Sequence, residues 1–132
     1  MFDAPGRTVV HLIEPQHLFV PALIDVFSEA GLFVDFVGAQ IDPRRLLDDQ
    51  PDLLFIDTDY LDEPLEGIRV AHVLVPKAQI CVYSSAHSEA ITRAFVAAGA
   101  DVVLEKSADR RAIVQGLREV ERRRRERHSR NS

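Results

Sequence analysis

Residues 51–59 read Pro-Asp-Leu-Leu-Phe-Ile-Asp-Thr-Asp, in which an unbroken apolar run is bounded by polar residues. Such a short run is typical of a strand that is buried on both faces, as in parallel sheets covered by helices on each side. Asp57 then lies at the carboxyl end of this strand, where open α/β sheets bind their ligands. The same residue is also explained as the start of a turn, because Asp-Thr-Asp favours turns. This segment alone leaves both interpretations of Asp57 open.

Strand and helix patterns alternate on both sides of this central strand. Apolar, β-rich runs predict further strands at residues 8–13, 32–38, 79–83 and 102–104. An amphipathic stripe from Phe19 to Ala30 predicts a helix that ends at Gly31, and further helices are predicted at 44–49, 68–75, 88–98 and after Ser107, with Asp42, Ser88 and Ser107 as N-caps. Residues 60–67 are polar and contain a proline, which favours a loop. Strands and helices that alternate in this way predict an α/β fold with a parallel sheet and helices on both faces.

The composition is that of one globular domain. With 132 residues, 46% of them hydrophobic and 28% charged, the chain can bury one core and leaves no room for a second domain. We assign residues 1–120 to this domain and residues 121–132 to a basic C-terminal helical extension or tail. The apolar stripe of the last helix stops at Val120, so we expect the extension to be solvated and to fray.

The charge is unevenly distributed along the chain. Residues 117–132 hold seven arginines and three glutamates, which gives +4, so residues 1–116 carry −9 of the net charge of −5. Duplex nucleic acids bind mainly through lysine and arginine, and an acidic body therefore argues against nucleic acid as the ligand of this domain. The alternative roles of the basic extension are a linker to an effector domain or a weak contact with a polyanion.

A single cysteine, Cys81, lies within an apolar run. This excludes a disulfide framework and a zinc cluster of cysteines, and it favours a buried structural thiol in the reducing cytoplasm. We find no signal peptide, no apolar run long enough to cross a bilayer and no lipidation motif, so we expect a cytoplasmic chain without a membrane partner.

Polar residues follow four of the predicted strands at the point where each strand ends. Glu14 follows the first strand, Asp57 the third, Ser84 the fourth and Lys106 the fifth. The carboxyl ends of parallel strands meet at one edge of the sheet, so these four side chains are expected to share one cleft. His11, by contrast, lies within a strand, and we expect it to be hydrogen-bonded or to face the edge of the sheet rather than to bind a ligand.

These residues give the chain a resemblance to the receiver domain of two-component response regulators, over about residues 8–120. The matching features are Glu14, the PDLLFID segment ending at Asp57, Ser84, and the Ala98–Asp101 segment that leads into a strand followed by Lys106. The resemblance implies a flavodoxin-like (βα)5 fold, a doubly wound five-stranded parallel sheet in the order 2-1-3-4-5. It also implies that Asp57 accepts a phosphoryl group, that Mg²⁺ bridges the acids and the phosphate, and that Ser84 and Lys106 contact phosphate oxygens.

Three departures from the family pattern concern this site. Pro15 stands where receivers usually have a second acid, so we expect Mg²⁺ to bind weakly through Glu14 and Asp57, with Asp59 as a substitute ligand. The loop at residues 60–67 does not have the family's sequence. Val103 occupies the position of the aromatic residue that usually switches conformation with phosphorylation.

The resemblance therefore implies a phosphoprotein of a two-component, or phosphorelay, signalling system and not an enzyme, beyond Mg²⁺-assisted self-phosphorylation and dephosphorylation. Its partners would be a sensor histidine kinase or phosphotransfer protein and a downstream protein or a second copy of the chain. No organic cofactor is expected, since the chain has no glycine-rich phosphate loop and topology alone is a weak argument for flavin. The alternative is a pseudo-receiver that acts as an interaction or dimerisation module without phosphorylation, which Pro15 and Val103 favour.

Overall fold

The computed structural model describes residues 6–86 and 88–131. In chain order the elements are β1 (Val10–Ile13), the 3-10 turn η1 (His17–Phe19), α1 (Val20–Glu29), β2 (Val34–Gly38), α2 (Pro43–Asp49), β3 (Leu53–Asp57), α3 (Pro64–Leu74), β4 (Gln79–Ser84), α4 (Glu89–Ala98), β5 (Val102–Glu105) and α5 (Arg110–Asn131). The strands form one parallel sheet in the order β2-β1-β3-β4-β5. This confirms the predicted flavodoxin-like α/β fold and its strand order.

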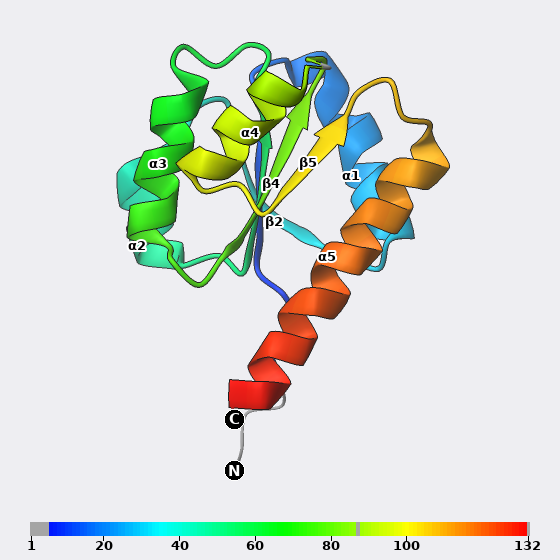
Figure 1. The fold of residues 1–132 in the computed structure, drawn as a ribbon. Coiled ribbons are helices and arrows are strands. Elements are labelled where there is room, and N and C mark those ends of the chain that lie inside the picture. The colour runs from blue at the N-terminus through cyan, green and yellow to red at the C-terminus, as the bar shows by residue number, and fades with distance from the viewer. Residues whose placement is uncertain (1–5, 87, 132) are drawn as a thin grey trace.

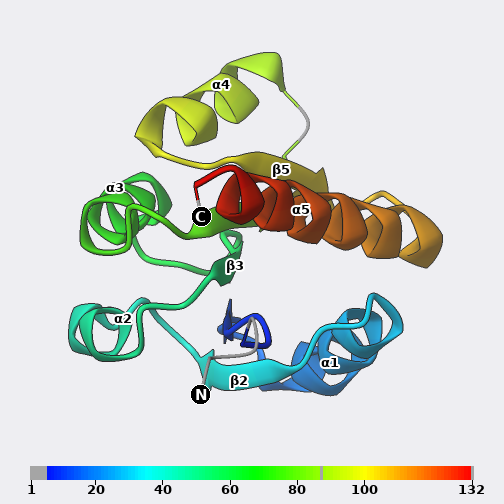
Figure 2. The same cartoon turned by 90° about the horizontal axis from the view of Figure 1, so that it is seen from below.

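Helices cover both faces of the sheet (Figure 1). α1 and α5 lie side by side on one face, and α2, α3 and α4 lie on the other, as the view from below also shows (Figure 2). Every residue of β3 is buried. Leu53 and Phe55 pack in the core on the α1/α5 side, while Leu54 and Ile56 pack in the core under α2–α4. Burial on both faces is the physical reason for the unbroken apolar run in β3.

Local signals set most helix ends where the sequence predicts them. The Asp42 and Ser88 side chains accept hydrogen bonds from Arg45 N and Ile91 N, so both act as the expected N-caps. Two helix boundaries differ from the prediction. α3 begins at Pro64, inside the predicted loop, because proline is well suited to the first turn of a helix. The first turn of α5 is bonded to Asp109 rather than to Ser107, since the Asp109 carboxylate accepts from Ala112 N at 2.8 Å.

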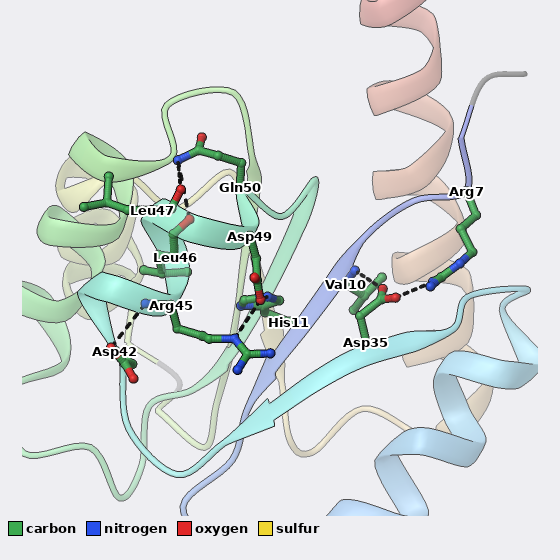
Figure 3. Close-up of polar contacts among 10 residues, drawn as sticks. All are labelled: Arg7, Val10, His11, Asp35, Asp42, Arg45, Leu46, Leu47, Asp49 and Gln50. Carbon is green, nitrogen blue, oxygen red and sulfur yellow. Dashed lines mark hydrogen bonds and ion pairs between the residues drawn. The ribbon is translucent and has the colours of Figure 1, made fainter. Parts of the chain in front are cut away.

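Buried polar side chains tie the strands to the surrounding elements. His11 of β1 is buried, and its Nε2 lies 2.9 Å from Asp49 Oδ2 of α2, as Figure 3 shows. Burial lowers the pKa of His11, although the Asp49 carboxylate opposes this effect. A neutral imidazole can donate from Nε2 to Asp49, while Nδ1 is buried without a hydrogen-bond partner among the described residues. This confirms that His11 is hydrogen-bonded, as expected.

The same view shows how a carboxylate closes the amino end of the β1–β2 pair. Asp35 Oδ2 accepts from Val10 N at 2.8 Å, and the Arg7 guanidinium pairs with Asp35 Oδ1 (Figure 3). The register shifts at this point, between Val10 and His11. The carboxylate therefore satisfies a strand N–H where the pairing is irregular.

Cys81 of β4 is fully buried in the core on the α1/α5 side. Burial raises the pKa of its thiol well above the ordinary value, so the thiol stays protonated in the folded chain. This confirms the expected free, buried cysteine.

The C-terminal extension remains in contact with the domain beyond Val120. α5 continues without a break to Asn131 and runs past the amino-terminal edge of the sheet (Figure 1). Glu121 is buried and accepts a hydrogen bond from Thr8 Oγ1, and Arg124 bonds both Glu121 Oε1 and Thr8 Oγ1 at 2.8 Å. The expectation of a solvated, fraying segment is wrong for these residues, because polar contacts replace the apolar stripe on which the expectation rested.

Replacing Arg124 with Met should lower the free energy of unfolding by about 1 kcal/mol, because it removes hydrogen bonds to a buried carboxylate and a buried hydroxyl. Urea denaturation measures the change. Arg123→Met is the matched control, since Arg123 is exposed and pairs with the exposed Glu119 of the same helix. Equal stability of the Arg124 variant and the control variant would contradict a structural role for Arg124.

No helix in the described ranges combines the length and the apolar character needed to cross a bilayer.

Candidate functional site

The strand ends bring the predicted polar residues to the carboxyl edge of the sheet. Asp57 is the last residue of β3 and Ser84 the last of β4, whereas Glu14 and Lys106 directly follow β1 and β5. Asp57 is 0% exposed and Glu14 is 2% exposed. Lys106 N donates to Ser84 O at 2.9 Å, which fixes the start of the loop that carries the lysine.

Lys106 bridges two carboxylates in this edge. Its Nζ lies 2.7 Å from Asp57 Oδ2 and 2.8 Å from Asp59 Oδ2. Burial disfavours the charge on Lys106, but hydrogen bonds with Asp57 and Asp59 outweigh this and raise its pKa. The side chain is therefore a permanent cation at neutral pH, placed directly on the oxygen of the predicted acceptor.

Asp59 is held by the backbone as well as by Lys106. Its Oδ1 accepts from Ser85 N at 3.1 Å, and its own amide donates to Asp57 Oδ1 at 3.0 Å. Burial favours the neutral acid, but the bonds from Lys106 and Ser85 lower the pKa of Asp59. Both oxygens of Asp59 thus have partners within the protein.

Glu14 is the least satisfied member of the group. Its Oε2 accepts from Gln16 N at 2.9 Å, while Oε1 is buried without a hydrogen-bond partner among the described residues. Burial, reinforced by the neighbouring Asp57 carboxyl, raises the pKa of Glu14 to about 7. Glu14 and Asp57 are therefore two adjacent buried acids. Asp57 pairs with Lys106, whereas Glu14 becomes protonated near pH 7.

The donor set offers a divalent cation two carboxylates rather than three. Within the described part of the chain, no group of three or more His, Cys, Asp or Glu side chains is arranged to hold a metal ion. The unpartnered Glu14 Oε1 beside Asp57 fits an oxygen-preferring cation such as Mg²⁺, which proteins often bind through one or two carboxylates with water. Asp59, the third expected ligand, is engaged by Lys106 and Ser85, so it fits this role less well.

Ser84 is buried beside these groups, and its Oγ accepts from Ala86 N at 3.0 Å. Val103, at the position of the family's switch aromatic, is partly buried and packs on the core under α2–α4. The aromatic side chain at this edge is instead Tyr83, which packs against Phe55 with a ring separation of 5.3 Å.

A group that the sequence reasoning missed surrounds Lys106. The rings of Phe19, Tyr60 and Tyr83 lie with their centroids 6.0, 5.6 and 5.2 Å from Lys106 Nζ. Tyr83 could have been found, because it pairs in register with Asp57 on the neighbouring strand. Phe19 comes from η1 and Tyr60 from the loop after β3, so only the folded chain brings them to the same lysine.

Comparison with known proteins gives structural neighbours only. No family model and no curated protein matches the chain. Among solved structures, a LuxR-family two-component response regulator from Aurantimonas sp. superposes with a TM-score of 0.79 at 18% identity, covering 87% of this chain and 85% of that one.

Two further structures illustrate the range of proteins that share the fold. A CheY-like response regulator receiver domain protein from Methanospirillum hungatei has a TM-score of 0.75 at 16% identity, covering 92% of this chain and 99% of that one. A putative pilus assembly-related protein from Burkholderia pseudomallei has a TM-score of 0.76 at 19% identity, covering 91% and 93%. At these identities the similarity establishes the fold, and this chain has the fold of the response regulator receiver domain.

Proposed function

We propose that this chain is a receiver of a two-component signalling system that accepts a phosphoryl group on Asp57. The observation that carries the proposal is the 2.7 Å contact between Lys106 Nζ and Asp57 Oδ2 at the end of the central strand. The ammonium is already in place to offset the charge that spreads over the phosphoryl oxygens during transfer.

In the proposed reaction an oxygen of Asp57 attacks the phosphorus atom of the donor. The new bond joins this oxygen to phosphorus, and the bond between phosphorus and the donor's leaving group breaks, which for a histidine kinase is a phosphorus–nitrogen bond. Lys106 and the Ser84 hydroxyl are proposed to bind the phosphoryl oxygens. Mg²⁺, held by Glu14 and Asp57, would supply further charge neutralisation. Asp59 is proposed mainly to orient Lys106.

The expected partners follow from this reaction. A cytoplasmic sensor histidine kinase or phosphotransfer protein would supply the phosphoryl group, and a downstream protein or a second copy of the chain would respond to it. The chain itself would be a phosphoprotein rather than an enzyme, with at most Mg²⁺-assisted self-phosphorylation and dephosphorylation.

A second candidate function is supported by the burial of the acceptor. Asp57 is 0% exposed, and its two oxygens accept hydrogen bonds from Asp59 N and Lys106 Nζ, so neither oxygen is open to a donor in this structure. Pro15 also removes one acid from the site. Both features favour a pseudo-receiver that acts through protein contacts without phosphorylation, and the same fold occurs in a putative pilus assembly-related protein.

Incubation with acetyl phosphate or phosphoramidate and Mg²⁺ distinguishes the two functions. We expect intact-mass spectrometry to show slow addition of one phosphoryl group to the parent chain, faster addition to Pro15→Asp, and none to Asp57→Asn. Asp48→Asn, at an exposed position of α2, is the control for a change of one acid.

Two outcomes would overturn the proposal. If neither the parent nor Pro15→Asp gains a phosphoryl group at high Mg²⁺, the pseudo-receiver is the better account. An adduct that persists in Asp57→Asn would place the acceptor on another residue.

A further inference from the structure

A cavity of about 520 Å³ opens beside the acceptor site, between α1 and α5. These two helices lie next to each other on one face of the sheet (Figures 1 and 2). Leu23 of α1 and Ile113 of α5 line the cavity, and the rings of Phe19, Tyr60 and Tyr83 also contribute to its walls. We call this cavity the aromatic pocket. Its volume and mainly apolar lining are those of small-molecule sites in proteins.

The rings of the aromatic pocket are only partly covered by the protein. Phe19 is 46% exposed and Tyr60 is 52% exposed, while Tyr83 is half-buried. Covering apolar rings that are in contact with water by another apolar surface is energetically favourable. Aromatic faces add a geometric preference, since rings attract one another when offset or edge to face. The walls therefore favour a flat aromatic ligand.

Arg110 indicates the charge of the ligand that this pocket would bind. Arg110, at the start of α5, pairs through Nε with Glu29 Oε1 at 3.2 Å, and about half of each side chain is exposed. An exposed ion pair of this kind contributes little to stability, so the guanidinium can exchange Glu29 for a ligand anion at low cost. A guanidinium also binds a carboxylate through two parallel hydrogen bonds.

Lys106 also lines the pocket, where it bridges two carboxylates. Two of its three N–H donors are used by Asp57 and Asp59, and its Nζ lies against the three rings. Asp59 is the acidic residue of the lining, and both of its oxygens already accept hydrogen bonds, from Ser85 N and Lys106 Nζ. Because the one charge of Lys106 is shared by the carboxylates of Asp57 and Asp59, Arg110 is the cation that a negative group on the ligand can use.

We propose that the aromatic pocket binds a planar aromatic carboxylate, with its ring among Phe19, Tyr60 and Tyr83 and its carboxylate on Arg110. The pocket shares Lys106 and Asp59 with the acceptor site, but binding in it needs neither a phosphodonor nor Mg²⁺. Its presence or absence can thus be established whatever the outcome at Asp57.

The test is a fluorescence titration of the full chain with 2-naphthoate, which is practical because the chain has no tryptophan. We expect saturable binding of 2-naphthoate and about tenfold weaker binding of 2-naphthamide, which has the same rings without the charge. Ala22 lines the pocket on the surface of α1, and Ala22→Phe should fill the space and abolish binding. Ala90→Phe, at an exposed position of α4 outside the pocket, should bind as the parent does.

A second pair of variants tests the cation without changing the cavity. Arg110→Gln should weaken 2-naphthoate binding about tenfold and leave 2-naphthamide binding unchanged, since only the carboxylate uses the guanidinium. Arg111→Gln, at the next residue and outside the lining, should change neither. The proposal fails if 2-naphthoate does not bind, if Ala22→Phe binds it as well as Ala90→Phe does, or if the amide binds as tightly as the acid.

Discussion

Lys106→Met is expected to lower the free energy of unfolding by about 3 kcal/mol at pH 8, because removing one partner of a buried ion pair leaves the other charge uncompensated. Asp57 is fully buried, and the same lysine also pairs with Asp59. The pKa of Lys106 is raised in the folded chain. Its contribution is therefore complete at pH 8 and would be lost only in alkaline solution, above the ordinary pKa of lysine.

Urea denaturation measures this loss, with Lys77→Met as the matched control at an exposed position. Adding Asp57→Asn to Lys106→Met should restore most of the stability, because the buried charge that the lysine neutralised is then absent. A Lys106→Met variant within about 0.5 kcal/mol of the parent, which is the range of ordinary surface substitutions, would show that the bridge does not stabilise the fold.

Glu14→Gln is expected to have the opposite effect at the same site, raising the free energy of unfolding by about 3 kcal/mol at pH 8. The pKa of Glu14 rises from 4.5 to about 7 on folding, through burial and the neighbouring Asp57 carboxyl. The folded chain therefore holds this proton more tightly than the unfolded chain does. The stability associated with the proton is complete below pH 4.5 and is lost as the pH rises through 7, whereas glutamine avoids this loss.

The gain from Glu14→Gln should consequently shrink towards zero at pH 4, and urea denaturation at both pH values measures the difference. Glu89→Gln at the exposed start of α4 is the control, since Glu89 is largely solvated and should change stability little at either pH. A gain that is equal at pH 4 and pH 8 would show that the ionisation of Glu14 is not its cause.

The fold could be predicted because its signals are local. An apolar run such as Leu53–Ile56 can be satisfied only between two layers of helices, and stops such as Gly31 and Gly99 have the positive φ angles that glycine adopts readily, 82° and 131°. The error in the C-terminal extension occurred where a polar contact between distant segments takes over. Arg124 lies one helical turn from Glu121, but nothing near Glu121 in the sequence shows that the distant Thr8 will donate to its carboxylate.

The candidate site could be predicted in its members but not in its bonding. Strand ends place Glu14, Asp57, Ser84 and Lys106 at one edge, because parallel strands share their direction. Which carboxylate Lys106 would select depends on the path of the loop after β3. That loop turns Asp59 onto the lysine and leaves Glu14 Oε1 without a partner among the described residues. Burial and the spacing of charges, which set the pKa of Glu14, exist only in the folded chain.

The buried Cys81 makes the chain a convenient host for site-specific labels. Its thiol is the only one in the sequence, and in the folded state it is both enclosed by the core and held in the unreactive protonated form. A second cysteine placed on the surface would therefore be modified by itself under native conditions, with no need to remove the natural one. Spin labels or dyes could in this way report on the loops around Lys106 in an otherwise unaltered protein.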